Sequence, residues 1–519
     1  MTLRLAAPAM FLASLLLLPF LNKPFTIDDA LFLREAKHAL VDPLHPADFE
    51  QVWNAGDRQK LSQYLVGGTL PAYVLAPVAA LGNREWVAHL YQLLLLCGFL
   101  LATVSVARRL GCSRIEANIV GLLVAANPVT LAMAATCMPD IMAMTFGMWG
   151  MDRVLAFREQ RQWLAGVAAG ILLAAALLCR VSTAPLLLVA AMFLWPDAWK
   201  SALKNFWPVA LAAVLATIGL LLNRGPAANA TVGGAFQALT SAANVPRNLI
   251  GFLSYQALTG PILLYALLSQ GRKFAGIVAA IAGVGIALSL IFDSPNLSQY
   301  AIPAALALCF IIACVKVSDA RATLPLVVWL GAGLVALPYV HMAAKYLLPC
   351  VPAAALLIVM HAARVRQQRY SLTVAILVAA GWICGAFIVV GDTTLATSQR
   401  EAVNRMVTPR VRRGIHVWAG GQWAFLAYAE DAGAKALANT PPLPQPGDEI
   451  VISRLDYYGM LNRLPIHKEL LNTQFDRRCG VFVLNRRFHA GFYSIRFGYL
   501  PFAIGCGELN AYDLYRVLP

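Results

Sequence analysis

Charged side chains that stand beside apolar runs are the residues of this chain best suited to chemistry. A charged group close to lipid is costly, so each one needs a reason. A carboxylate can accept a proton from a nucleophile, and a cation can hold a phosphate. The acids and cations concerned, together with one adjacent tyrosine, are Asp28, Asp29, Asp140, Arg180, Lys345 and Tyr346.

The adjacent acids Asp28 and Asp29 are expected to have different duties. Thr26 and Asp29 are three residues apart and resemble a capping box in which Asp replaces Glu. This pattern predicts a surface helix that begins at Ile27 and ends before Pro43. Asp29 would be the cap partner, whereas Asp28 lies about 100° further around the helix and has no such task. Asp28 is therefore the candidate base; alternatively, both acids only complement the helix dipole.

Each remaining charge has a functional and a structural interpretation. Asp140 is either a cap in a tight turn or a second acid that faces the same cavity as Asp28. Lys345, followed by Tyr346, is either a snorkelling anchor or a phosphate contact at the outer leaflet. The same two interpretations apply to Arg180, at the outer end of an apolar run.

Membrane helices must position these residues. Of the 519 residues, 59% are hydrophobic and 13% are charged, whereas a soluble domain carries roughly a quarter charged residues. This composition excludes a soluble enzyme, a disordered chain and a fibrous repeat. Runs of helix length predict an all-α polytopic protein with about 13 spans of roughly 20 residues or slightly fewer. The runs are 5–21, 85–107, 115–135, 141–157, 163–179, 183–195, 206–222, 249–268, 274–292, 300–315, 324–340, 346–361 and 372–390.

The distribution of charge predicts the orientation. The chain has 41 Lys and Arg against 26 Asp and Glu, a net charge of +15. Alternate short loops are basic, as the positive-inside rule requires when the N-terminus is cytoplasmic, so no nucleic-acid partner is expected. Asp28, Asp140 and the segment after Asp392 then lie outside. We expect a multi-pass protein of the bacterial cytoplasmic (inner) membrane.

The chain is expected to have two parts. Residues 1–390 form the membrane body, in which residues 22–84 are a first periplasmic loop with surface helices, and residues 391–519 form a small periplasmic α/β domain. Cys479 and Cys506 either pair in an oxidising compartment or stay two buried thiols. In this domain we expect a helix over 422–437 and strands over 414–419, 449–453, 481–485, 493–497 and 512–517.

The sequence specifies no cofactor. No His, Cys or Asp spacing defines a metal site, although a divalent metal is possible. The G-x-S-x-G, Walker and Rossmann fingerprints do not occur.

The motifs, in this order, resemble those of the GT-C membrane glycosyltransferases. The most similar branch is the family 39-like group of protein O-mannosyltransferases and aminoarabinose lipid A transferases. The resemblance rests on Asp28-Asp29-Ala30-Leu31-Phe32-Leu33-Arg34-Glu35-Ala36, Met138-Pro139-Asp140, Leu178-Cys179-Arg180-Val181-Ser182, Lys345-Tyr346-Leu347-Leu348-Pro349 and a tail segment from Val417 to Glu430.

The resemblance implies an inverting transfer of a hexose or pentose from a polyprenyl-phosphate donor. The acceptor would be a lipid, a glycan or a protein at the outer membrane face. Asp28 would be the general base, and Asp140 would position the acceptor or the donor. Lys345 and Arg180, with Tyr346, would hold the lipid phosphate as its charge grows.

Two alternatives predict other features. A transporter or lipid flippase favours charges near the bilayer midplane and two repeated halves, whereas here the acids gather at one edge. An O-antigen ligase or polymerase favours a large outer loop late in the chain, whereas here the first loop is the large one.

Overall fold

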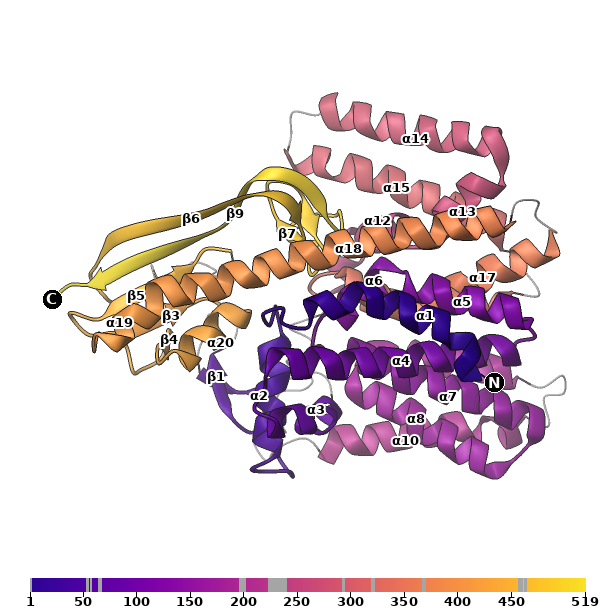
Figure 1. Cartoon of the computed structure of the whole chain (residues 1–519), viewed down its shortest axis with the longest axis horizontal. Helices are drawn as coiled ribbons and strands as arrows, with labels where there is room; N and C mark the ends of the chain where they lie inside the picture. Colours follow the sequence, from indigo (N-terminus) through magenta and orange to yellow (C-terminus); the bar gives the residue numbers. More distant parts are fainter. Residues whose placement is uncertain are drawn as a thin grey trace.

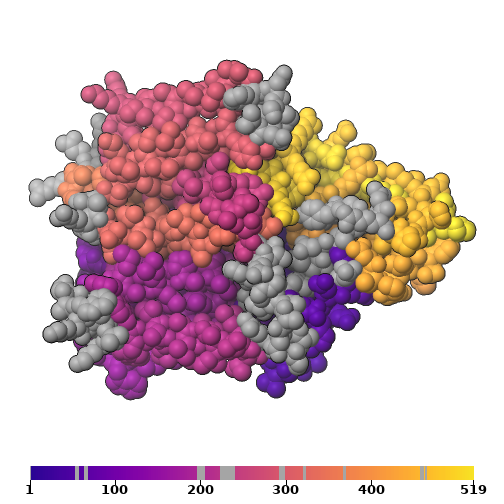
Figure 2. Space-filling view, turned by 180° about the vertical axis from the view of Figure 1, so that it is seen from behind, coloured from indigo at the N-terminus to yellow at the C-terminus, as the bar shows by residue number. Residues whose placement is uncertain are grey.

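Helices packed side by side form most of the molecule, and a β-sheet region lies at one end of them (Figure 1). The computed structural model describes residues 2–52, 56, 58–63, 68–195, 202–222, 240–291, 295–318, 323–365, 370–455, 461 and 464–519. Seen from behind, the C-terminal residues form a lobe that projects beyond the helices, with N-terminal residues against it (Figure 2). The fold is therefore a helical multi-span body with a mixed α/β region, as predicted.

Seven described helices, counting continuous pieces as one, are long and apolar enough to cross a membrane. They cover Thr2–Phe20, Glu85–Arg109, Asn205–Leu222, Gly271–Ile291, Gln299–Val317, Ala344–Arg364 and Tyr370–Arg412. The count rises to nine if the bent pairs Arg114–Ala125 with Pro128–Ala134 (62°) and Ala242–Thr259 with Pro261–Ser269 (57°) are single spans. The remaining predicted runs form shorter apolar helices or, for α7 (Asp140–Gln160), a helix with charged residues at both ends.

The helical elements occur in the following order. They are α1 (Thr2–Leu17), α2 (Asp29–Ala39), α3 (Leu70–Ala80), α4 (Glu85–Arg109), α5 (Arg114–Ala125), α6 (Pro128–Ala134), α7, α8 (Trp163–Cys179), α9 (Pro185–Leu194), α10 (Ala202–Leu222), α12 (Val245–Thr259), α13 (Pro261–Ser269), α14 (Gly271–Ile291), α15 (Pro295–Val317), α16 (Leu324–Leu330), α17 (Val351–Arg364), α18 (Tyr370–Ala402), α19 (Thr408–Arg412) and α20 (Trp423–Asp431). Short 3-10 helices join several of them, notably η3 (Val181–Thr183) and η8 (Ala344–Cys350).

Helix α2 begins two residues later than predicted. Ile27 has a φ of 43°, which lies in the left-handed region and excludes it from a right-handed helix. The Thr26 hydroxyl donates a hydrogen bond to Asp392 (3.1 Å) instead of capping α2. Asp29 does accept a hydrogen bond from the Thr26 backbone N–H (2.9 Å), so half of the predicted capping box forms.

The C-terminal region is built on a five-stranded mixed sheet of order β4-β3-β5-β9-β6. The central strands β3 and β5 are parallel, and β9 runs antiparallel to both β5 and β6. Cys479 and Cys506 are register partners on β6 and β9 and form a disulfide, which confirms the pairing interpretation. The strands are β3 (Val417–Gly420), β4 (Lys435–Ala436), β5 (Glu449–Ser453), β6 (Lys468–Phe482) and β9 (Ala503–Val517), with the small pairs β1 (Glu50–Val52) and β2 (Arg58–Lys60), and β7 (Leu484–Asn485) and β8 (Ala490–Gly491), elsewhere.

The predicted strand over 493–497 is wrong. The segment turns at residues 495–497 and packs against the membrane body. The Ile495 N–H donates to the Met342 carbonyl (2.9 Å), and the Tyr255 hydroxyl donates to the Gly491 carbonyl (2.6 Å). The alternation of apolar residues therefore reflects burial against helices and not membership of a sheet.

Helix α18 passes through the predicted boundary between residues 390 and 391 without a break. It continues through the π-helical turn Val403–Val407 into α19, so one long helix carries the chain from the bundle to the sheet. Figure 1 shows this helix crossing the molecule. The two predicted parts thus share a helix, and the first strand of the sheet starts only at Val417.

Candidate functional site

Four of the predicted site residues form two ion pairs. The Lys345 Nζ lies 3.4 Å from Asp28 Oδ2, and the Arg180 Nη1 lies 3.0 Å from Asp140 Oδ2. The Arg180 guanidinium carbon lies 5.3 Å from the centre of the ring of Tyr346, the residue after Lys345, and so links the pairs. We call these five residues, Asp28, Asp140, Arg180, Lys345 and Tyr346, the outer ion-pair cluster, since sequence analysis predicts them to lie outside.

Each member of this cluster stands at a break in a helix. Asp28 precedes the first residue of α2, and Asp140 is the first residue of α7. Arg180 has an extended backbone between α8 and η3, and Lys345 belongs to η8, which leads into α17. At such ends the backbone changes direction, so side chains from several helices can point to one place. The paired residues Asp28 and Lys345 are 317 positions apart.

The acids of the cluster differ in exposure. The Asp28 side chain is 21% exposed, whereas the Asp140 side chain is 3% exposed and held by Arg180. Asp28 can therefore meet a substrate, while Asp140 acts on its surroundings through Arg180. The Lys345 ammonium lies 3.4 Å from both Asp28 and the Met138 sulfur. The contact between Lys345 and Asp28 is longer than the usual charge-assisted hydrogen bond of about 2.7–2.9 Å, so Asp28 binds Lys345 only weakly.

Aromatic rings close one side of the cluster. The rings of Tyr339 and Tyr346 meet edge to face with their centres 6.1 Å apart, and His341 lies beside Tyr339 at 5.3 Å. Burial, with further contributions from Lys345 and two arginines, lowers the pKa of His341 to about 3. The imidazole is therefore neutral at physiological pH and is a weaker base than an ordinary histidine.

Sequence analysis missed a second group of charges, which joins Lys23 in the first loop to Asp392 in α18. The Lys23 Nζ lies 2.7 Å from Asp392 Oδ2, and the two side chains are 0% and 2% exposed. Lys23 also donates to the Ala135 carbonyl (2.8 Å), and the Thr26 hydroxyl donates to Asp392. Asp392 directly follows an apolar run in the sequence, which is the one signal that could have marked it. With Asp29, these residues, Lys23, Thr26 and Asp392, are called the buried anchor cluster.

Asp29 belongs to the anchor and not to the more exposed site. It is fully buried, and its Oδ2 and Oδ1 atoms accept the backbone N–H groups of Thr26 (2.9 Å) and Cys137 (2.7 Å). Burial raises the pKa of Asp29 to about 7, against the opposing effects of Lys23 and the two N–H donors. Because Cys137 shortly precedes Asp140, Asp29 ties the start of α2 to the turn that carries the second acid.

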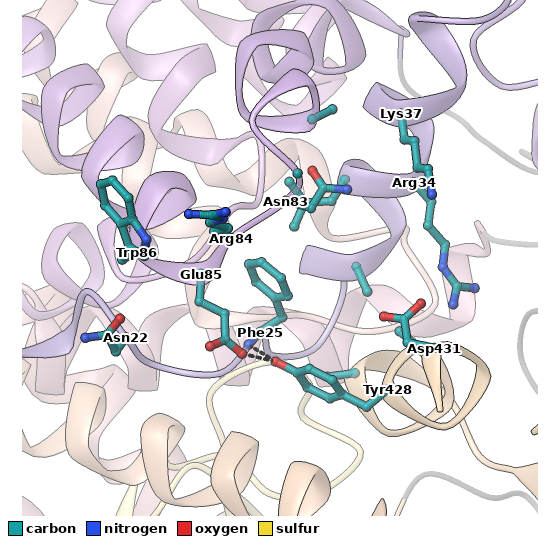
Figure 3. A pocket seen from close by; sticks show the side chains of 16 residues that line it. Asn22, Phe25, Arg34, Lys37, Asn83, Arg84, Glu85, Trp86, Tyr428 and Asp431 are labelled. Atoms are coloured by element: carbon teal, nitrogen blue, oxygen red, sulfur yellow. Dashed lines mark hydrogen bonds between the residues drawn. The ribbon is translucent and has the colours of Figure 1, made fainter. Parts of the chain in front are cut away.

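A cavity of about 640 Å³ lies between α2, the start of α4 and α20 (Figure 3). None of the five residues of the outer ion-pair cluster lines it, although Phe25 and Ala30, close to Asp28 in the chain, do. Within the described part of the chain, no group of three or more His, Cys, Asp or Glu side chains is placed to hold a metal ion.

A family model matches the region that carries two of the cluster residues. Residues 68–222, which include Asp140 and Arg180, match the model described as dolichyl-phosphate-mannose-protein mannosyltransferase. The match confirms the resemblance to this membrane glycosyltransferase family and the predicted enzyme class. No curated protein matches the chain.

Several solved structures are similar to the chain at low identity. ArnT from Cupriavidus metallidurans in the apo state is 16% identical, with a TM-score of 0.48 over 89% of this chain and 94% of that one. The same protein bound to undecaprenyl phosphate is also 16% identical, with a TM-score of 0.47 over 89% of this chain and 95% of that one. The Archaeoglobus fulgidus oligosaccharyltransferase in the apo form is 11% identical, with a TM-score of 0.46 over 84% of this chain and 64% of that one.

Proposed function

We propose that the chain transfers a sugar from a polyprenyl-phosphate donor to an acceptor of the cell envelope, with inversion at the anomeric carbon. The acceptor is a lipid, a glycan or a protein, and the reaction takes place at the outer face of the bacterial inner membrane. The observation that supports this best is the outer ion-pair cluster, in which a partly exposed carboxylate and two cations share one place.

Asp28 is the proposed general base. Its carboxylate takes the proton from the acceptor nucleophile as the nucleophile's oxygen or nitrogen bonds to the anomeric carbon. The bond from that carbon to the phosphate oxygen breaks, and polyprenyl phosphate leaves with one more negative charge. The long contact between Lys345 and Asp28 allows the lysine to turn from the carboxylate to the phosphate, which frees Asp28 to accept the proton.

Arg180 is the second proposed phosphate contact. Its guanidinium offers several N–H donors in a fixed plane, which suits a phosphate better than a point charge does. Asp140 is a positioning residue, since it fixes this plane from one side while the Tyr346 ring lies against the guanidinium. Two cations placed before the reaction stabilise the charge that develops on the leaving group.

The alternatives, a transporter or flippase and an O-antigen ligase or polymerase, receive less support. The cluster stands at breaks between helices on the side of α2 and the sheet, and a transporter is expected to place such charges near the midplane. A flippase also has no need of a base such as Asp28 with two cations beside it.

The test compares cell-envelope lipids and glycans by mass spectrometry in cells with and without the protein. Loss of the protein should remove one sugar from one product. Cells that carry Asp28→Asn should show the same loss, because removal of a general base costs about 10²–10⁴-fold in rate. The matched control is Asp48→Asn, an acid of the same loop that is paired with Lys60 outside the cluster. Equal product in Asp28→Asn and wild type, at equal membrane levels, contradicts the assignment.

A further inference from the structure

The cavity beside α2 has walls from three separate parts of the chain. One face of α2 contributes residues at helical spacing, and α20 contributes Tyr428 and Asp431 (Figure 3). Arg84 comes from the turn before α4, and Trp86 comes from the first turn of α4. The α2 residues are Ala30, Leu33, Arg34 and Lys37. The cavity thus joins the first loop to the C-terminal region, and its volume of about 640 Å³ is within the range of small-molecule sites.

The charges of the cavity wall are only partly neutralised by the protein. Arg34 pairs with Glu430 (2.5 Å), and Glu85 is bound by Arg400 (2.9 Å) and by the Tyr428 hydroxyl (2.6 Å). In the described part of the chain, no acid lies within ion-pair distance of Lys37 or Arg84. These two cations face one unpaired lining acid, Asp431, which leaves a positive excess.

Aromatic rings provide the apolar part of the wall. Phe25 and Tyr428 stack with their ring centres 6.5 Å apart and their planes at 14°. Trp86, 45% exposed, lies in the first turn of α4, whose body is long and apolar enough to span a membrane. Tryptophan at such a position is typical of a membrane–water interface. Rings of this kind pack against the apolar faces of sugars, while cations hold phosphate or carboxylate groups.

We propose that this cavity binds a saccharide that carries an anionic group, either phosphate or carboxylate. The inference does not depend on the proposed function, because no residue of the outer ion-pair cluster lines the cavity. Helix α2 starts next to Asp28 and presents Arg34 and Lys37 to the cavity.

The test is a binding titration of the full-length protein in neutral detergent, with glucose 6-phosphate as the probe and glucose as the uncharged comparison. Tryptophan fluorescence is the signal, and Trp86→Phe assigns it to the cavity. Glucose 6-phosphate should bind and glucose should not. The double variant Lys37→Gln/Arg84→Gln should raise the Kd at least tenfold. Lys60→Gln, which removes a cation of the same loop outside the cavity, should leave it unchanged.

Competition identifies the source of the anionic group. Phosphatidylglycerol in nanodiscs that displaces glucose 6-phosphate supports a lipid headgroup, and phosphatidylglycerol that does not displace it supports a soluble saccharide. An unchanged Kd in a correctly eluting double variant, or equal binding of glucose, overturns the inference. Asp28→Asn should bind the probe as wild type does. Full sugar transfer by Asp28→Asn would therefore defeat the proposed function, while the titration still reports on the cavity.

Discussion

The buried anchor cluster and the outer ion-pair cluster include the adjacent acids Asp29 and Asp28, yet the ion pairs of the two clusters differ. The lysine–aspartate contact is 2.7 Å between Lys23 and Asp392 and 3.4 Å between Lys345 and Asp28. The anchor pair is 0% and 2% exposed, whereas the outer pair is 8% and 21% exposed. A buried charge must be paired by the protein itself, and a partly exposed one can exchange its partner. The buried anchor cluster is therefore suited to stabilising the fold, and the outer ion-pair cluster is suited to binding a substrate.

The largest effect on folding is expected from Lys23→Met. This change leaves the buried Asp392 carboxylate without its cation, which costs about 3–5 kcal/mol in the free energy of unfolding. Thermal unfolding followed by size-exclusion chromatography should show a large loss of folded protein. The double variant Lys23→Met/Asp392→Asn, which removes both charges, should recover most of the loss. A single variant as stable as wild type would mean that the pair is not structural.

The next effect is expected in the outer cluster, from Arg180→Lys. The charge stays, but the planar set of donors and the contact with the Tyr346 ring are lost. Sugar transfer should fall by about tenfold, which corresponds to roughly 1.4 kcal/mol, with the melting temperature nearly unchanged. Arg114→Lys at the predicted inner side is the control and should transfer normally. A melting temperature that falls with the activity would make Arg180 part of the architecture instead.

The variant Asp29→Asn tests whether Asp28 and Asp29 have different roles. The amide keeps one acceptor, but its NH₂ group then faces a backbone N–H of Thr26 or Cys137. Loss of one such bond in a buried place costs about 1–3 kcal/mol. Stability should therefore fall more than turnover does, which is the reverse of Asp28→Asn. If Asp29→Asn instead folds normally and loses transfer, the division of labour between the two acids is wrong.

The membrane body and the charged residues of the outer ion-pair cluster were predictable, because the sequence patterns that mark them are local. Apolar runs of helix length mark the spans, and Asp28, Asp140, Arg180 and Lys345 stand beside such runs. The pairing of Lys345 with Asp28 was not predicted, since no local pattern joins residues 317 positions apart. Lys23 and Asp392 were missed for the same reason, because Lys23 follows the first apolar run and Asp392 follows the last.

The β6 strand could not be predicted from the pattern of apolar residues. Residues Lys468–Phe482 are polar and largely exposed along most of their length, so the alternation that marks a half-buried strand is absent. The partner strand β9 was predicted only near its end, over 512–517, where it is buried. Burial, and not strand formation itself, is what the pattern reports, which also explains the error at 493–497.

Glu35, the second acid within α2, extends the comparison to a buried carboxyl group that the described residues do not pair. The Glu35 side chain is buried, and in the described part of the chain neither oxygen has a hydrogen-bond partner. Burial raises the pKa of Glu35 from 4.5 to about 8. Between pH 4.5 and about 8 the folded state therefore keeps a proton on Glu35 that the unfolded state releases. The free energy of unfolding falls as the pH rises through this range. Glu35→Gln should raise the melting temperature at pH 8.5 by about 2–5 °C and leave it unchanged at pH 4.5. The exposed Glu50→Gln is the control, and equal pH dependence of Glu35→Gln and wild type would show that Glu35 is ionised in the fold.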